Sequence, residues 1–220
     1  MTTNVTPDPP AYPDNRITFR LAMAGTPLPL ASLTDGEARQ VAALPGEPRR
    51  RTWLTARRAM RRALSRAALP ADTSAYVFPN RRVSVSYAGT LAVAMALSGD
   101  ADPVRGVGVD IELREPPPLE TARLFLTARE RGRLLALPIA ARPGALLRQW
   151  TVKEALYKAN PANAGTHLRA YALDNPAARK GTAFLTGAPQ LEFRYLTLEL
   201  PHGYLSVALT LSRNGAPSHG

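Results

Sequence analysis

Three acidic residues and a lysine stand in two short segments of this chain, at spacings that could bring them together. Asp110 and Glu112 are two residues apart in an apolar segment, so in a β-strand both side chains would point to one face. Glu154 and Lys158 are four residues apart, which is one turn of an α-helix. If that helix packs beside the strand, three carboxylates and one ammonium group meet.

Such a cluster is typical of a site for a divalent cation and phosphate. Neighbouring carboxylates repel one another, and a cation between them relieves the repulsion. Oxygen ligands suit Mg²⁺, which often arrives with the phosphates of a substrate. The two segments therefore predict a site for a magnesium diphosphate or a similar polyanion, and Gly108, on the same strand face, would leave room for it. The alternatives are a solvated strand edge and an ordinary helical ion pair.

The composition restricts the chemistry further. The 220 residues contain no cysteine and three scattered histidines, which excludes disulfides and thiolate catalysis and makes a zinc site of the usual ligands improbable. The net charge is +11, carried almost entirely by arginine, yet two of the three lysines, Lys153 and Lys158, lie in the second segment. A basic protein favours an acidic partner, namely nucleic acid, a membrane surface or an acidic protein. Without a membrane span or a secretory signal pattern, we expect a cytoplasmic protein that binds no membrane.

Apolar periodicity predicts an α+β protein. Helices are expected at 48–69, 120–137 and 145–159, and strands at 83–87, 91–97, 107–113, 191–200 and 204–211. Helices followed by a small, mainly antiparallel sheet thus occur in each half, which predicts two similar lobes in a pseudo-two-fold arrangement.

The prolines at 116–118 predict a stiff connector over residues 115–119. The expected N-terminal lobe then covers 16–114 and the C-terminal lobe covers 120–213. We expect a loose N-terminal tail at 1–15 and a disordered end at 214–220.

The two acidic segments together resemble the paired signatures of the 4′-phosphopantetheinyl transferases. Gly108-Val109-Asp110-Ile111-Glu112 precedes Trp150-x-x-Lys153-Glu154-Ala155-x-x-Lys158, and Phe125-x-x-x-x-Glu130 stands between them, as in that family. The two-lobed surfactin-synthetase-activator type is the closer match, because its single chain of about this length covers both lobes. The resemblance implies that family's fold and its reaction. The reaction transfers the phosphopantetheine arm of coenzyme A to a serine of an apo acyl or peptidyl carrier protein and releases adenosine 3′,5′-bisphosphate.

The resemblance also implies roles for individual residues. Asp110 and Glu112 match the metal-binding pair, and Glu154 matches the third ligand and a candidate base for the serine; Mg²⁺ is the expected ion and Mn²⁺ the alternative. Lys158 matches the lysine that contacts the transferred phosphate. Further matches are Lys153 and Arg57 for coenzyme A (Arg58 is the other register for Arg57), Trp150 as a supporting residue or core anchor, and Glu130 as a further ligand or water-positioning group.

One element departs from the family pattern. Ser84-Val85-Ser86-Tyr87-Ala88-Gly89 aligns with Asn-x-Ser-His-Ser-Gly, so Ser86 and Tyr87 fall at coenzyme A positions and Tyr87 replaces the usual histidine. A tyrosine can donate one hydrogen bond to a phosphate but cannot become cationic near neutral pH. The affinity for coenzyme A, or its pH dependence, is therefore expected to differ from the family's.

The arginines between 57 and 66 leave three alternatives, a solvated face, a phosphate site and a docking surface for an acidic carrier protein. A rival hypothesis is a basic module that binds nucleic acid or another polyanion, and a third is a catalytically weak homologue kept for carrier binding. Aromatic residues make up 6% of the chain and no nucleic-acid reading motif is evident, so no nucleic-acid partner is expected. Both halves of the site lie on one chain, which favours a monomer. The resemblance associates such proteins with polyketide synthases, nonribosomal peptide synthetases and secondary metabolism.

Overall fold

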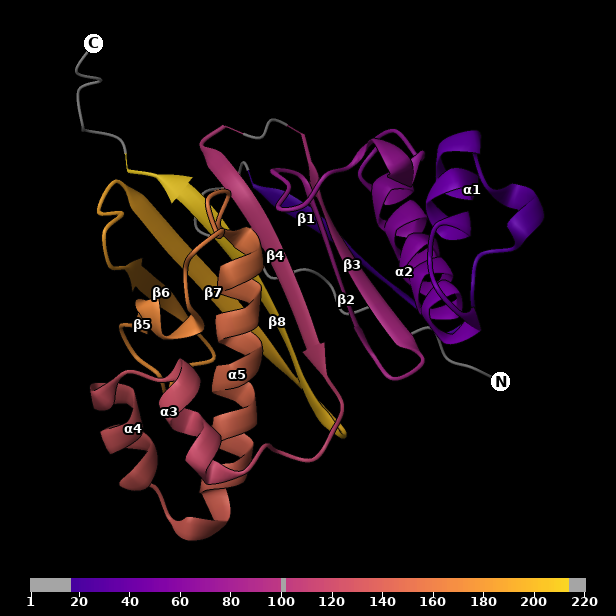
Figure 1. The fold of residues 1–220 in the computed structure, drawn as a ribbon. Helices are drawn as coiled ribbons and strands as arrows, with labels where there is room; N and C mark the ends of the chain where they lie inside the picture. Colours follow the sequence, from indigo (N-terminus) through magenta and orange to yellow (C-terminus); the bar gives the residue numbers. More distant parts are fainter. Residues whose placement is uncertain (1–16, 100–101, 214–220) are drawn as a thin grey trace.

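The computed structural model describes residues 17–99 and 102–213. The tails expected at 1–15 and 214–220 lie outside the described residues. The chain is an α+β protein with two antiparallel sheets packed with helices, as the sequence predicts (Figure 1). Within the described part, no helix is both long and apolar enough to cross a membrane.

The first sheet has the order β1-β3-β2, with β1 at Thr18–Ala24, β2 at Val83–Ala88 and β3 at Leu91–Ser98. The hairpin between β2 and β3 turns at Gly89, whose φ of +57° suits a glycine. The long helix α2 (Glu47–Arg66) packs on one face of this sheet through small side chains, mostly alanines of β1, β3 and the helix itself. Helix α1 (Asp35–Ala42) lies beyond α2 (Figure 1).

The second sheet has the order β4-β8-β7-β6-β5. Its strands are β4 (Val104–Glu112), β5 (Tyr171–Leu173), β6 (Lys180–Leu185), β7 (Leu191–Leu200) and β8 (Gly203–Ser212). Helix α5 (Arg142–Ala159) covers one face, with the short helices α3 (Ala122–Phe125) and α4 (Ala128–Leu135) beside its first half (Figure 1). Short 3-10 turns lie at Leu30–Ser32, Thr73–Ala75, Leu119–Thr121, Ile139–Ala141 and Leu168–Ala170.

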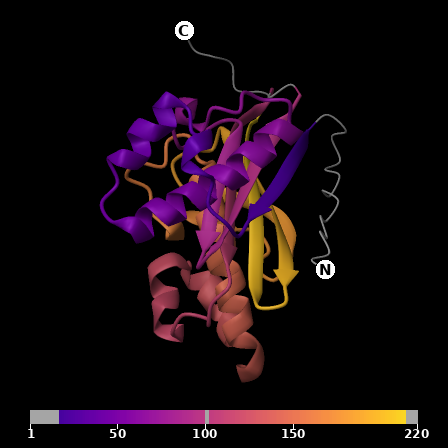
Figure 2. The same cartoon turned by 90° about the vertical axis from the view of Figure 1, so that its right-hand side faces the viewer.

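The apolar faces of the two sheets pack against each other. Val107, Val109 and Ile111 of β4 are buried in one cluster with side chains of β1, β3 and β8. The opposite face of β4 carries Asp110 and meets α5, so the strand alternates as predicted. Each sheet thus has a long helix on its outer face and the shared core on its inner face, and Figure 2 gives the side view.

Two predictions of the strand and helix pattern need revision. Strand β4 pairs with β8 and belongs to the second sheet, so the sheets divide before β4, earlier than the connector at 115–119; the lobe boundary there stays a prediction. The single helix expected at 120–137 is broken into α3 and α4, because Thr127 has extended backbone and caps the N-terminus of α4.

Both halves of the chain contain the same buried glutamate arrangement. Thr34 with Glu37 forms a capping box at the start of α1, and Thr127 with Glu130 forms one at the start of α4. Each glutamate is also paired with a cation on the following long helix, Arg61 of α2 or Lys153 of α5. This correspondence supports the similarity of the two halves that helix and strand order indicates.

Candidate active site

Helix α5 lies directly on β4 because glycine allows the two backbones to approach. A Cβ atom added to Gly108 would lie 1.9 Å from the carbonyl oxygen of Ala155, and one added to Gly106 would lie 2.1 Å from that of Ala159. The interpretation that Gly108 leaves room for a ligand is therefore wrong, since the helix backbone fills that space. The glycines instead bring the side chains of α5 next to those of β4.

The helix runs antiparallel to the strand, which pairs their side chains in reverse order. Lys158 contacts Asp110. About two turns earlier on the helix, Trp150 contacts Glu112. Glu154 lies between Trp150 and Lys158 on the same stripe of the helix, because four residues make about one turn. The structure thus brings together the residues of both acidic segments.

Asp110 is held by the first sheet as well as by α5. Its Oδ1 atom accepts hydrogen bonds from Ser86 Oγ at 2.8 Å and from Lys158 Nζ at 2.7 Å, and Lys158 Nζ also donates to Ser86 Oγ at 2.9 Å. The side chain of Asp110 is buried, and its Oδ2 atom has no hydrogen-bond partner among the described residues. A buried carboxylate oxygen without a donor is costly, so Oδ2 is a candidate ligand atom.

Glu112 is engaged by its neighbours at the other end of the stripe. Trp150 Nε1 donates to Glu112 Oε1 at 2.9 Å, and Arg114 Nε lies 2.8 Å from Oε2. The Trp150 ring also packs edge-on against Phe125, with 5.0 Å between ring centroids. Trp150 therefore anchors the helix in an apolar cluster and holds a carboxylate of the candidate site.

The carboxylate of Glu154 makes no hydrogen bond within the described part of the chain. Burial raises the pKa of Glu154 above its ordinary value, and the carboxylates of Asp110 and Glu112 raise it further, while Lys158 and Arg114 lower it. Glu154 is thus close enough to both acidic neighbours for their charges to act on it.

The donor chemistry of this group suits a divalent cation. Among residues 17–99 and 102–213, no three acidic or histidine side chains are grouped as a metal site. Asp110 is paired with Lys158 and Glu112 with Arg114, so these cations balance the charge. The buried, unpartnered Oδ2 of Asp110 and the unbonded carboxylate of Glu154 are the oxygens that a hard cation would use.

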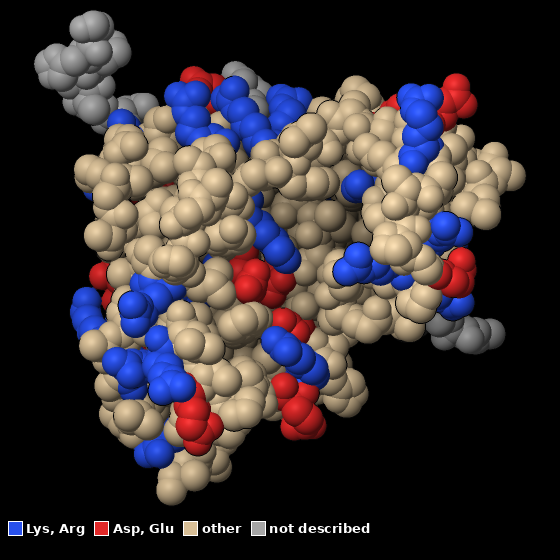
Figure 3. Space-filling view, in the orientation of Figure 1, with Lys and Arg blue, Asp and Glu red and all other residues tan. Residues whose placement is uncertain are grey.

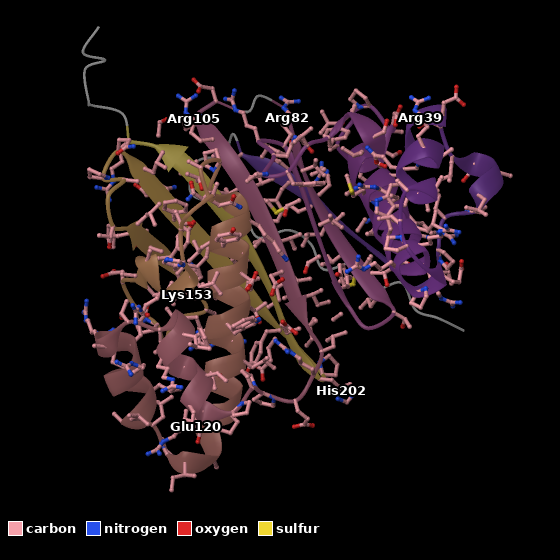
Figure 4. All side chains as sticks on the ribbon, viewed as in Figure 1. Arg39, Arg82, Arg105, Glu120, Lys153 and His202 are labelled. Carbon is pink, nitrogen blue, oxygen red and sulfur yellow. The ribbon has the colours of Figure 1, made fainter. Side chains whose placement is uncertain are left out.

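Lys153 and Glu130 form a buried ion pair of their own. Figure 4 shows the position of Lys153 on α5. Lys153 Nζ donates to Glu130 Oε1 at 2.8 Å, to Oε2 at 2.9 Å and to the carbonyl oxygen of Tyr171. All three of its N–H groups are used, so none is left for a coenzyme A phosphate. The structure does not bring these residues to Asp110 as the expected roles in coenzyme A and metal binding require.

Breaking this pair should strongly destabilise the fold. Replacing Glu130 with alanine leaves the Lys153 ammonium buried without a counter-charge, and we expect the free energy of unfolding to fall by about 3–5 kcal/mol. Urea unfolding would measure the loss. Alanine at the exposed Glu120 is the control, with a change within about 0.5 kcal/mol. A loss at position 130 no larger than at 120 would contradict the structural role.

The two remaining coenzyme A candidates of the first half lie on or near α2. Tyr87 is 60% exposed and lines a shallow pocket with Arg51, Thr52 and Thr55 of α2 and with the hairpin residues 89–91. Arg57 stacks over Trp53, with its guanidinium carbon 4.5 Å from the ring centroid. Its Nε atom is buried without a hydrogen-bond partner in the described part, and burial lowers its pKa while Glu37 raises it.

Other arginines of α2 are bound by the chain itself. Arg62 and Arg66 donate to the carbonyl oxygens of Met23 and Leu21, each at 2.7 Å, at the edge of β1 that does not pair with β3. Arg58 likewise donates to the carbonyl oxygen of Pro27 at 3.1 Å. The contacts of Arg62 and Arg66 cover the free edge of β1, and all three arginines weigh against a freely solvated basic face for nucleic acid.

The space-filling view shows a hollow in the middle of the face that bears α5, between the two halves of the molecule (Figure 3). Acidic and basic side chains gather on one side of it, and further basic side chains lie on the opposite side (Figure 3). A polyanion in this hollow would meet cations from both halves. Fold and site together define an α+β protein with a candidate phosphate-handling centre where its two sheets meet.

A comparison with known families agrees with this description. Residues 106–209 match the model of the 4′-phosphopantetheinyl transferase superfamily, a stretch that contains most of β4, all of α5 and most of β8. No curated protein matches the chain. This part of the chain is thus similar to that superfamily, and the similarity supports a phosphopantetheine transferase activity in general terms, with coenzyme A and carrier proteins as the superfamily's general substrates.

Proposed function

We propose that this protein transfers the 4′-phosphopantetheine arm of coenzyme A to a serine of an apo acyl or peptidyl carrier protein, with Mg²⁺ as the metal ion. The serine oxygen forms a bond to the phosphorus that carries the pantetheine arm. The bond from that phosphorus to the bridging oxygen breaks, and adenosine 3′,5′-bisphosphate leaves. The serine proton passes to a base of the protein.

The observation that carries this proposal is the group formed by Asp110, Ser86 and Lys158 beside Glu154. Its contacts join both sheets and α5 within hydrogen-bond distance, and it includes the unpartnered Oδ2 of Asp110. The superfamily match covers every member of the group except Ser86.

Each side chain has a proposed task in the transfer. The Lys158 ammonium, which is 29% exposed, is placed to meet the transferred phosphate while Asp110 holds it in position. Glu154 would accept the serine proton, because its carboxylate makes no hydrogen bond within the described part of the chain and lies beside Asp110 and Lys158. Asp110, Glu112 and Glu154 would hold the metal ion, whose chemistry when bound is to neutralise charge on the diphosphate oxygens. Arg57, Ser86 and Tyr87 would contact coenzyme A from the first half.

Intact-protein mass spectrometry tests the proposal. Purified protein, coenzyme A and MgCl₂ are incubated with a panel of apo acyl and peptidyl carrier proteins. A carrier mass raised by one phosphopantetheine arm is the expected result, and carriers with the acceptor serine changed to alanine are the control. No mass change across the panel would contradict the proposal. Salt-sensitive DNA binding that survives loss of Asp110 and Glu112 would instead favour the basic polyanion-binding module.

The replacement of histidine by Tyr87 yields a separate prediction. Tyr87→His would place a group that becomes cationic near pH 6 beside the pocket that Arg51 lines. We expect the KM for coenzyme A to fall by about twofold to fivefold at pH 6 and to change little at pH 8, as for an exposed charge pair. Tyr87→Phe is the control without a titrating group. An equal KM for all three proteins at pH 6 would place Tyr87 outside the coenzyme A site.

The finer assignments belong to the same proposal. We propose a monomeric, cytoplasmic enzyme of the two-lobed surfactin-synthetase-activator type, whose carriers belong to polyketide or nonribosomal peptide pathways. Size-exclusion chromatography with light scattering tests the monomer, and the carrier panel tests the pathway.

A further inference from the structure

We propose that the buried Lys153–Glu130 pair is a positioning device that fixes the rotation of α5, and thereby sets Glu154 and Lys158 against β4. This inference rests on the proposed function in one respect, because its kinetic test measures the rate of phosphopantetheine transfer.

The contacts hold the Lys153 ammonium from three directions. Its acceptors are the two carboxylate oxygens of Glu130, at 2.8 and 2.9 Å, and the carbonyl oxygen of Tyr171 in β5. Both side chains are almost fully buried, at 0% and 2% side-chain exposure. A buried ammonium with every N–H group bonded cannot move without losing a bond.

Glu130 in turn is bound to two other elements. Its Oε2 atom accepts from the backbone N–H of Thr127 at 2.7 Å, which is the N-cap of α4, and its Oε1 atom accepts from the backbone N–H of Leu173 at 2.8 Å, in β5. The carboxylate therefore links α4, β5 and α5. The link to α5 is made by Lys153, which donates to both oxygens of the Glu130 carboxylate.

Lys153 directly precedes Glu154 in α5, so the contacts that fix Lys153 also affect the position of the Glu154 carboxylate. Successive residues of a helix are rotated by about 100° around its axis, and a helix rotation that displaces one displaces the other. Gly106 and Gly108 present no side chains to α5, so β4 holds the helix through the bonds from Lys158 to Asp110 and from Trp150 to Glu112. Hydrogen bonds from Arg148 to the carbonyl oxygens of Ala178 and Pro176 and from Thr210 to that of Ala159 hold the helix nearer its ends.

The first half of the chain repeats the arrangement without an acidic centre beside it. Glu37 lies in a capping box with Thr34, accepts from the backbone N–H of Thr73 at 3.1 Å and pairs with Arg61 of α2. The residue after Arg61 is Arg62, which binds the edge of β1 and takes no part in the proposed chemistry. Loss of this pair should affect stability but not the positions of Glu154 and Lys158.

The test compares two matched double variants, Lys153→Met with Glu130→Gln and Arg61→Met with Glu37→Gln. Both replace a buried ion pair by neutral side chains, which avoids an unpaired buried charge. For the first, we expect the kcat of arm transfer to fall by about 10- to 100-fold, with the KM for coenzyme A within about twofold of the wild type. For the second, we expect kcat within about twofold at a similar urea midpoint.

A second readout does not depend on activity. Trp150 lies one turn before Glu154, and its indole donates to Glu112. In a Trp53→Phe background, where Trp150 is the only tryptophan, rotation of α5 should shift its emission to longer wavelength and increase its quenching by acrylamide. We expect this change in the Lys153–Glu130 variant alone.

The outcomes separate this inference from the proposed function. Unchanged Trp150 emission in the Lys153–Glu130 variant overturns the inference whatever the rate, and so does a wild-type kcat. Equal losses of kcat in both double variants also overturn it, because they would reflect stability alone. If the wild type transfers nothing to any carrier but the emission changes as expected, the proposed function fails and the positioning role stands.

Discussion

Replacing Glu154 with glutamine should lower the rate of arm transfer by about 10²- to 10⁴-fold, the usual contribution of a positioned base. The same change should raise the thermal midpoint at pH 7 in metal-free buffer. The carboxylate makes no hydrogen bond in the described part, and burial together with Asp110 and Glu112 disfavours its charge, so glutamine removes a repulsion. A functional side chain that reduces stability is typical of active sites.

The pH dependence of that gain follows from the direction of the shift. The pKa of Glu154 is raised above its ordinary value of 4.5 in the folded protein. The folded state therefore favours the protonated form, and wild-type stability falls as the pH rises through this range. The advantage of glutamine should be present at pH 7 and absent near pH 4. Gln at the exposed Glu120 is the control for both readouts. A wild-type rate in the Glu154 variant would remove the base assignment, and a lower midpoint at pH 7 would contradict the repulsion.

Replacing Gly108 with alanine should both destabilise the protein and abolish transfer. The added Cβ atom would lie 1.9 Å from the carbonyl oxygen of Ala155 and 2.7 Å from the backbone nitrogen of Ala159. Both are backbone atoms of α5, so the helix must move away from β4. We expect the free energy of unfolding, measured in urea, to fall by about 3 kcal/mol, near the upper end of overpacking costs.

The chain offers a matched control for this substitution at Gly132. That glycine lies in α4, where an added Cβ atom would meet nothing within 4 Å. Alanine there should stabilise the protein by about 0.5–1 kcal/mol, because alanine favours the helix. If alanine at 108 were tolerated as well as alanine at 132, α5 would not depend on the glycine for its close approach to β4.

The elements that carry the acidic segments were predictable from sequence. Alternation of Val107, Val109 and Ile111 with Gly108 and Asp110 fixes which face of β4 is buried, and spacings of four place Glu154 and Lys158 on one helix stripe. Both signals are local and periodic. Strands β7 and β8 are also local, since a Pro-His-Gly turn joins two apolar segments.

Other parts of the fold depend on distant contacts. Strand β5 has only three residues, Tyr171–Leu173, which is too short for a periodic signal. Strand β1 and helix α1 were not predicted either, although Thr34-x-x-Glu37 carries the capping-box signal that marks the start of α1. The sheet that β4 joins could not be read from order along the chain, because its partner β8 follows about a hundred residues later.

Motif agreement did not indicate the buried ion pair that Lys153 and Glu130 form, and their roles in coenzyme A and metal binding stay predictions. Their positions match the family signatures, but a motif does not say which side of a helix faces the substrate. Helical geometry contains that information, since Lys153 is rotated by about 100° from Glu154 and cannot share its stripe. The structure places it in a buried pair with Glu130. Thr127-x-x-Glu130, the same capping-box pattern as Thr34-x-x-Glu37, was the signal for a structural glutamate.

A crystal structure with coenzyme A and Mn²⁺ would test the central claim most directly, because anomalous scattering locates the ion. We predict one Mn²⁺ at ligand distance, about 2.0–2.3 Å, from Oδ2 of Asp110, from the Glu154 carboxylate and from the diphosphate. Lys158 should then contact the phosphate of the pantetheine arm. An ion that is not bound by residues of both β4 and α5, with coenzyme A bound away from Asp110, would contradict the account.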